Sequence, residues 1–265
     1  MTAQRRLLVN TLSDILDIDP VRDALFLDID GTLLNIVNNP AEVSVPPNLV
    51  VLLQQLQSLF SGAVAVITGR QIADVDRLFA PLKLTASGVH GSEIRLDPFR
   101  ETVRYAAEIS TIDIAAITVI AARYPGVMIE PKGTGVAVHY RNVPEKSAAL
   151  HDDLATFLSG VDARLIMSRG RMVFEILPKG LSKGTAIEHL MHSAPFANRR
   201  PVMIGDDVGD MPAFDLVQRM HGLAIRVAGE HFTLQQSELP NPETVRELLH
   251  ALASKSHHQR PEITS

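Results

Sequence analysis

The sequence predicts an α/β protein: a doubly wound, Rossmann-like parallel-sheet core with a smaller α/β domain inserted into it. Short apolar runs alternate with helical patterns near the start of the chain and again near its end, which is typical of βαβ units. The middle of the chain has a different texture, with short strand patterns between two helical ones. We therefore predict a core of residues 1–104 and 181–265, and an insert of residues 105–180.

The first part of the core is predicted from short apolar runs with helices between them. Buried strands are expected at residues 24–29, 63–67 and 84–87. Helices are expected at residues 46–60, where leucines recur at helical spacing after Pro46, and at residues 71–79. Since two strands joined by a helix form a βαβ unit, the sheet is predicted to be parallel.

In the insert, we predict helices at residues 113–124 and 145–158, and strands at residues 127–129 and 135–140. A hairpin is expected to join residues 164–167 to residues 172–177 across a polar turn at residues 168–171. The core pattern then returns, with predicted strands at residues 201–205 and 223–227 and helices at residues 183–192, 211–219 and 242–253. Residues 254–265 are expected to form a frayed polar tail.

Composition excludes several classes of protein. The 265 residues are 46% hydrophobic and 21% charged, a globular balance that excludes a disordered chain. The formal net charge is −5 and aromatic residues make up only 5%, so nothing indicates a nucleic-acid partner. The chain contains no cysteine, which excludes a disulfide scaffold, a thiol nucleophile and a Cys-ligated metal site.

Two segments raise the question of a membrane or an export signal. Residues 1–17 carry two arginines before an apolar patch, but polar residues interrupt that patch, so we expect a soluble leader. Residues 43–69 are free of charge, yet prolines and glutamines interrupt them, so no membrane span is expected there. We therefore expect a cytoplasmic protein with no membrane partner. No pattern indicates an oligomeric state.

Two aspartates follow the first predicted strand, in the run DIDGT at residues 28–32. Side chains alternate along a strand, so Asp28 and Asp30 are expected to point the same way at the carboxyl edge of the sheet, where ligands bind. Two adjacent carboxylates need a cation or a shared proton. The alternative is an ordinary Asp-Gly turn, which the position directly after a buried strand disfavours.

Thr68 and Lys183 each stand at the start of a predicted helix. The Thr68 hydroxyl and the free backbone N–H groups near it suit an anionic oxygen, although a simple helix cap is the more common explanation. Lys183 opposes the helix dipole, which a bound anion would explain; a solvated lysine is the alternative.

The run GDDVGD at residues 205–210 places three carboxylates within five positions after another predicted strand. Asp206, Asp207 and Asp210 would be hard to hold together without a cation, and oxygen-only ligands favour Mg²⁺. The alternative is an acidic helix N-terminus, which fits Asp210 better than it fits Asp206.

In chain order, the carboxylate pair, the hydroxyl, the lysine and the acidic cluster resemble the motifs of the haloacid dehalogenase-like phosphohydrolases over the whole chain. The resemblance implies that Asp28 is the nucleophile and Asp30 the general acid and base. It implies that Thr68 and Lys183 are also catalytic and hold the phosphoryl group.

The same resemblance implies a Mg²⁺ cofactor. The nucleophile Asp28, the backbone carbonyl of Asp30 and the loop residue Asp206 would bind it, with Asp207 as a further candidate ligand. These roles agree with the chemistry, because a cation and a lysine offset the repulsion between a carboxylate and a phosphate dianion. Covalent catalysis would then split one displacement into two easier steps.

The insert narrows the substrate. Its position resembles the larger α/β cap class of that superfamily, and four runs, GVHG, EPKG, HYR and VFEILPKG, together resemble the trehalose-6-phosphate phosphatases. The resemblance implies substrate binding by Arg70, His90, Glu130, Lys132, His139, Arg141 and Glu175. For Lys132 and Arg141 the alternative is an exposed strand charge, and for His139 it is a core histidine.

The expected activity is therefore the Mg²⁺-dependent hydrolysis of trehalose 6-phosphate to trehalose and phosphate through an aspartyl phosphate. A related phosphatase of sucrose phosphate, mannosyl phosphoglycerate or a hexose phosphate is the first alternative; a phosphomutase and an inactive sugar-phosphate sensor are others. One departure from the family pattern stands in the acidic loop, where Gly209 and Met211 replace a hydroxyl and a carboxylate. We expect metal binding to survive but the surroundings of the metal to differ.

Overall fold

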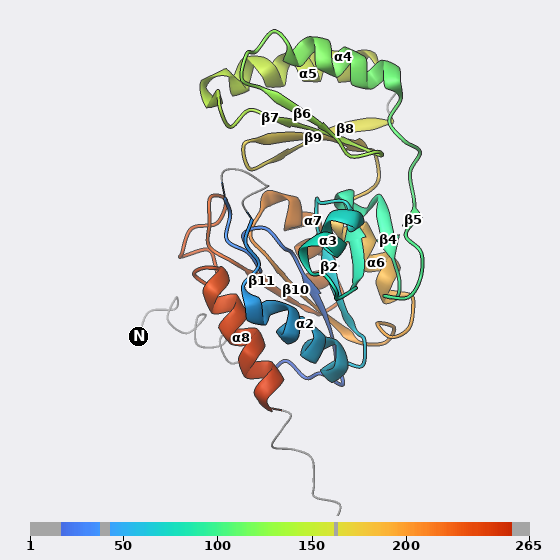
Figure 1. The fold of residues 1–265 in the computed structure, drawn as a ribbon, viewed down its shortest axis with the longest axis vertical. Helices are drawn as coiled ribbons and strands as arrows, with labels where there is room; N and C mark the ends of the chain where they lie inside the picture. Colours follow the sequence, from blue (N-terminus) through green and yellow to red (C-terminus); the bar gives the residue numbers. More distant parts are fainter. Residues whose placement is uncertain (1–16, 38–42, 162–163, 256–265) are drawn as a thin grey trace, which may run out of the picture.

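The computed structural model describes residues 17–37, 43–161 and 164–255. The predicted leader, except its last residue, and the predicted tail from residue 256 lie outside the described residues. Within the described parts the chain forms two sheets, one above the other in Figure 1. Among the described residues, none of the helices has both the length and the hydropathy of a membrane span.

The larger sheet has seven strands in the order β11-β10-β1-β2-β3-β4-β5. Its parallel part consists of β1 (Asp23–Leu27), β2 (Val64–Ile67), β3 (Thr85–Gly88), β10 (Arg200–Gly205) and β11 (Leu223–Arg226). Every residue of β1 and β2 is buried, as expected for central strands of a sheet covered on both faces. The prediction of a parallel α/β sheet is confirmed.

Two strands at one edge of this sheet were not predicted. β4 (Glu93–Arg95) pairs antiparallel with β3, and β5 (Val103–Arg104) pairs antiparallel with β4. They are three and two residues long, too short for an apolar run or a period-2 pattern to show. From β5 the chain leaves for the insert (Figure 1).

Helices cover the larger sheet: α2 (Pro47–Leu59), α3 (Ile72–Leu78), α6 (Lys183–Met191), α7 (Met211–Arg219) and α8 (Pro242–Lys255). α2 packs beside α8, and α6 packs beside α7. Each buries an apolar stripe; in α2 the buried positions are Leu49, Leu52, Leu53 and Leu56. The predicted helices therefore lie where the sequence placed them, within a few residues at each end.

The insert is a four-stranded antiparallel sheet in the order β6-β7-β9-β8. Its elements are α4 (Thr111–Ala121), β6 (Met128–Pro131), β7 (Val136–His139), α5 (Ser147–Gly160), β8 (Leu165–Gly170) and β9 (Val173–Pro178). Both helices lie on the face of the sheet turned away from the core, where a separate hydrophobic cluster fills the space between them and the strands (Figure 1). The other face of the sheet looks toward the core.

The predicted hairpin forms, but its turn is shorter than expected. β8 extends to Gly170, so Ser168, Arg169 and Gly170 are strand residues rather than turn residues. Only Arg171 and Met172 separate the two strands, and Met172 takes a positive φ of 52°. The polar stretch suggested a loop because this strand is only partly buried, with Ile166 and Arg169 exposed. The domain boundaries at residues 104–105 and 180–181 stay predictions.

Candidate active site

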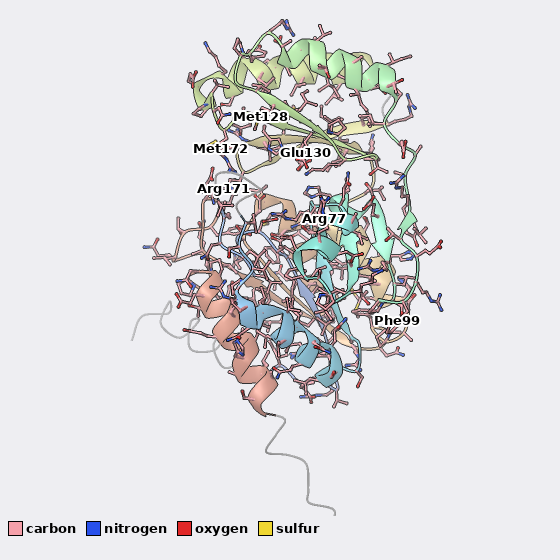
Figure 2. All side chains as sticks on the ribbon, in the orientation of Figure 1. Arg77, Phe99, Met128, Glu130, Arg171 and Met172 are labelled. Atoms are coloured by element: carbon pink, nitrogen blue, oxygen red, sulfur yellow. The ribbon has the colours of Figure 1, made fainter. Side chains whose placement is uncertain are left out.

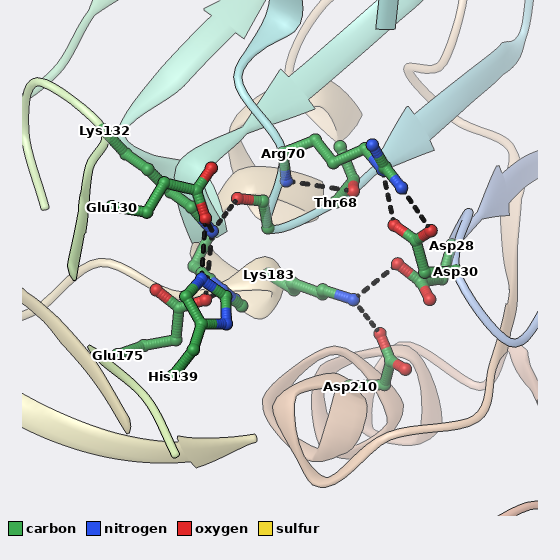
Figure 3. A network of polar contacts seen from close by, with 12 residues as sticks. Asp28, Asp30, Thr68, Arg70, Glu130, Lys132, His139, Glu175, Lys183 and Asp210 are labelled. Carbon is green, nitrogen blue, oxygen red and sulfur yellow. Dashed lines mark hydrogen bonds and ion pairs between the residues drawn. The ribbon is translucent and has the colours of Figure 1, made fainter. Parts of the chain in front are cut away.

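Asp28 lies directly after β1, at the carboxyl edge of the larger sheet, and is 4% exposed. Lys183, the first residue of α6, donates from Nζ to Asp28 Oδ1 at 2.6 Å and to Asp210 Oδ1 at 2.6 Å (Figure 3). Burial would lower the pKa of the Lys183 ammonium, but Asp210 and Asp28 outweigh it and raise that pKa. Lys183 is therefore a fixed cation beside the predicted nucleophile and not a solvated lysine.

Three carboxylates converge at this point. Oxygen atoms of Asp28, Asp206 and Asp210 lie within 4.8 Å of one another, and all three residues are buried. Burial and the nearby Asp210 raise the pKa of Asp206 to about 7. Burial also raises the pKa of Asp28 well above its usual value, although Lys183 opposes the shift. An all-oxygen set of crowded carboxylates is the donor chemistry that Mg²⁺ prefers, so the residues fit the predicted cofactor.

The loop after β1 makes room for this cluster through Gly31. Its φ is +86°, and a Cβ at this position would lie 2.0 Å from Oδ2 of Asp206. Thr32, the next residue, donates its hydroxyl to Oδ1 of Asp206 at 3.2 Å. Gly31 and Thr32 both stand in the run DIDGT but carried no predicted role, although the Asp-Gly pair was a signal for this turn.

Asp30 lies apart from the carboxylate cluster. β1 ends at Leu27, so the strand alternation that predicted a shared direction for Asp28 and Asp30 does not extend to them. Arg70 instead donates two hydrogen bonds of 2.6 Å to the Asp30 carboxylate. Thr68 is 1% exposed, and its hydroxyl accepts from the backbone N–H of Arg70 at 3.2 Å. Thr68, Arg70 and Asp30 thus form one side of the site.

Asp207 also points away from the cluster. Its Oδ1 accepts from the backbone N–H of Val208 at 2.6 Å and lies 3.0 Å from Nε2 of His231. Asp210 takes the place beside Asp28 that the sequence could equally have given to Asp207. Oδ2 of Asp210 accepts from the backbone N–H groups of Asp206 and Asp207, which locks the acidic loop.

The insert contributes a second polar group on its core-facing side. Lys132 and Glu175 are both buried, and Lys132 Nζ donates to Glu175 Oε1 at 3.1 Å. Glu130, whose position on this face Figure 2 shows, accepts from His139 across 2.8 Å. That contact with His139, together with Lys132, lowers the pKa of Glu130 although burial opposes the shift. His139 is therefore a partner of Glu130 and not a core histidine.

Several contacts join the insert to the core around the site. Lys132 Nζ donates to the backbone carbonyl of Gly69 at 3.2 Å, and Arg141 donates to the carbonyl of Val37 at 2.9 Å. At the hairpin turn, Arg171 lies 2.8 Å from Glu230 of the core. Lys132 and Arg141 are therefore not exposed strand charges.

One cavity of about 260 Å³ lies between the two sheets. Its walls carry nearly all the predicted site residues: Asp28, Asp30, Arg70, His90, Glu130, Lys132, His139, Arg141, Glu175, Lys183, Asp206 and Asp207. Thr68 is buried directly behind Arg70. On the core side of the cavity, Lys183 and the aspartates form one charged pole. On the insert side, Lys132 and Glu175 form a second pole, of mixed charge.

Known proteins resemble this chain along most of its length. A family model described as trehalose-phosphatase matches residues 26–248. A probable trehalose-phosphate phosphatase of Sinorhizobium fredii is 39% identical over 236 residues, which cover 87% of each chain. The trehalose-6-phosphate phosphatase of Escherichia coli K12 is 37% identical over 205 residues, which cover 77% of each chain.

Solved structures agree on the fold. The C-terminal domain of the Candida albicans trehalose-6-phosphate phosphatase superposes with a TM-score of 0.75 at 22% identity, covering 94% of this chain and 96% of that domain. With the family match over residues 26–248 and both sequence relatives, this chain belongs to the trehalose-phosphatase family, and so to the phosphoric monoester hydrolases.

Proposed function

We propose that this enzyme hydrolyses trehalose 6-phosphate to trehalose and phosphate, with Asp28 as nucleophile and a bound Mg²⁺. The observation that carries the proposal is the pairing, in one cavity, of the Asp28–Lys183 pole with the Lys132–Glu175 pole. The first suits a phosphoryl group and the second suits hydroxyl groups. A phosphorylated sugar presents both.

In the first step, a carboxylate oxygen of Asp28 forms a bond to phosphorus while the bond from phosphorus to the sugar oxygen breaks. Lys183 holds Oδ1 of Asp28, which leaves Oδ2 for the attack. Asp30 supplies a proton to the departing sugar oxygen, and Arg70 orients the Asp30 carboxyl. In the second step Asp30 takes a proton from the water that hydrolyses the aspartyl phosphate.

The carboxylates of Asp28, Asp206 and Asp210 would hold the Mg²⁺, since their oxygen atoms already converge. The backbone carbonyl of Asp30 and the side chain of Asp207 are the further ligands that the family resemblance implies, although Asp207 is engaged by His231. When bound, the cation supplies positive charge that offsets the repulsion between Asp28 and the phosphate.

We propose that the insert is a cap that recognises the sugar. Lys132 and Glu175 are buried charged groups at the cavity wall, and Oε2 of Glu175 has no hydrogen-bond partner among the described residues. A buried oxygen without a donor is costly, and a sugar hydroxyl would supply the donor. Glu130, with His139 and Arg141 beside it, extends the same polar wall.

The proposal is tested by measuring phosphate release from a panel of sugar phosphates with Mg²⁺, with and without a chelator. Trehalose 6-phosphate should have the highest kcat/KM, and the chelator should abolish turnover reversibly. A preference for sucrose phosphate, mannosyl phosphoglycerate or a hexose phosphate would reassign the substrate. Conversion of a sugar phosphate to an isomer without phosphate release would indicate a phosphomutase, and binding without turnover would indicate a sensor.

A further inference from the structure

The turn at Val89–Gly91, between β3 and β4, has an unusual backbone. Val89 and His90 are consecutive and both lie in the left-handed region, with φ values of 45° and 51°. This region is sterically unfavourable for an L-residue, and a β-branched residue such as valine rarely enters it. Strain of this kind persists only where surrounding contacts impose it, and it is common at functional sites.

The contacts that impose this turn come from the phosphate side of the site. Val89 donates its backbone N–H to the carbonyl of Arg70 at 2.9 Å, and His90 donates to the carbonyl of Thr68 at 3.2 Å. On the other side, a Cβ on Gly91 would lie 2.6 Å from the carbonyl oxygen of Ser182, the residue before Lys183. The turn therefore packs between the start of α6 and the loop that follows β2 and contains Thr68, which we call the Thr68 loop.

The His90 side chain is enclosed by three separate segments. A Cβ on Gly69 would lie 2.6 Å from His90 Nε2, so the ring packs directly on the Thr68 loop. A Cβ on Gly209 of the acidic loop would lie 3.7 Å from His90 Cε1. From the insert, Glu175 Oε1 lies 3.6 Å from His90 Nε2. Among the described residues, Glu175 forms ion-pair contacts with His90 and Lys132, and of these two only His90 belongs to the core.

The His90 contact contributes to the electrostatics of Glu175, although at 3.6 Å it is longer than a hydrogen bond and Nε2 of His90 has no hydrogen-bond partner among the described residues. Burial alone would raise the pKa of its carboxyl, but Lys132 and His90 outweigh burial and hold that pKa well below its usual range. Lys132 belongs to the insert and moves with Glu175, whereas His90 belongs to the core. Of these two partners of Glu175, His90 is the one that belongs to the core, so its contact with Glu175 depends on how the insert sits on the core.

We propose that His90 is a positioning residue: its imidazole holds Glu175 Oε1 against the Thr68 loop, and so couples the docking of the insert to the phosphate site. This inference rests on the proposed function and revises the expectation that His90 binds the substrate. His90 acts through Glu175, whose other oxygen is free to meet the substrate. Losing the imidazole should therefore impair sugar phosphates and spare substrates too small to reach the insert.

The test is a double-mutant cycle of His90→Asn and Glu175→Gln, assayed on trehalose 6-phosphate and on a small aryl phosphate. Asparagine tolerates a positive φ, so the turn is preserved while the imidazole is lost. We expect His90→Asn to lower kcat/KM for the sugar phosphate about tenfold or more. The loss in kcat/KM for the aryl phosphate should be smaller than this loss by a factor of at least five. In the Glu175→Gln background, the same change should cost less than about twofold.

Two further variants separate the contact from the fold. His221→Asn replaces an exposed histidine that also has a positive φ, 56°, at the end of α7, and should change neither activity. His90→Gln keeps an N–H donor of similar reach and should recover at least threefold of the loss seen with asparagine. Thermal unfolding of each variant checks that the fold is intact.

Independent, multiplying losses from His90→Asn and Glu175→Gln would overturn the proposal, as would equal losses on both substrates or no recovery with glutamine. These outcomes differ from a failure of the proposed function. If the parent enzyme prefers another sugar phosphate, the cycle is measured with that substrate, and the coupling between His90 and Glu175 is tested unchanged.

Discussion

Asp206 carries a buried carboxyl whose pKa is raised to about 7 by burial and by the neighbouring Asp210, from an ordinary value of 3.8. Because the folded-state pKa is the higher one, the folded protein binds protons more tightly than the unfolded chain between these two values. The free energy of unfolding of the metal-free enzyme should therefore fall as pH rises through this window, with the loss complete above about pH 7.

We expect Asp206→Asn to stabilise the metal-free enzyme at pH 8. A shift of about three pKa units corresponds to a ceiling of about 4 kcal/mol, at roughly 1.4 kcal/mol per unit. The hydrogen bond from Thr32 survives, because an asparagine Oδ1 accepts as the carboxylate does. The new amide N–H₂ has to find acceptors in the buried site, which reduces the gain to about 2 kcal/mol. That is a rise in Tm of about 4–8 °C for a chain of this size.

The assay is thermal unfolding of parent and variant in chelator at pH 5, 6, 7 and 8, followed by addition of Mg²⁺. The difference in Tm should grow from pH 5 to pH 8, since only the parent acquires the extra buried charge. Mg²⁺ at pH 8 should raise the Tm of the parent and leave that of Asp206→Asn nearly unchanged. A variant that is less stable than the parent in chelator at pH 8 would refute the reasoning.

Three further outcomes follow from the site. Asp28→Asn should abolish phosphate release and any acid-stable phosphoenzyme, whereas Asp30→Asn should slow turnover by ~10²–10⁴-fold. Normal turnover by the Asp28→Asn variant would show that Asp28 is not the nucleophile. Glu175→Ala should cost about 1.5–3 kcal/mol in kcat/KM on the disaccharide phosphate and little on an aryl phosphate, and equal losses would indicate a folding role. Gly31→Ala should lower Tm and Mg²⁺ affinity more than Gly180→Ala. Both glycines have a positive φ, but only a Cβ on residue 31 would lie 2.0 Å from a carboxylate oxygen. Equal effects of the two variants in calorimetry would show that the crowding at residue 31 is relieved.

The strands of the larger sheet were predictable because a buried parallel strand needs apolar side chains on both faces. β1 and β2 are accordingly short runs without a polar residue after Asp23. β4 lacks this signature, since it buries Glu93 and Arg95. Arg95 is satisfied by two hydrogen bonds to Asp76, a long-range pairing that no local pattern reveals.

The position of the site was predictable for a similar reason. Parallel strands end at one edge, so polar residues after β1, β2 and β10 had to meet there. The partners within the site were not predictable, because they depend on how each short turn directs its side chains. A one-turn 3₁₀ helix at Val208–Asp210 directs Asp210 to Lys183 and leaves Asp207 with His231, although Asp207 is the residue next to Asp206 in sequence.

Formal charge distinguishes the two poles of the cavity. On the core side, one ammonium, Lys183, faces three carboxylates, so two negative charges stay uncompensated once all three are ionised. A divalent cation would neutralise that pole and allow a phosphate dianion to approach it. On the insert side, Lys132 and Glu175 already compensate each other. That pole can gain from neutral hydroxyl donors but gains little from a second anion. Under the proposed function, these charges favour one orientation of a sugar phosphate, with its phosphate at Asp28 and its hydroxyls at Glu175.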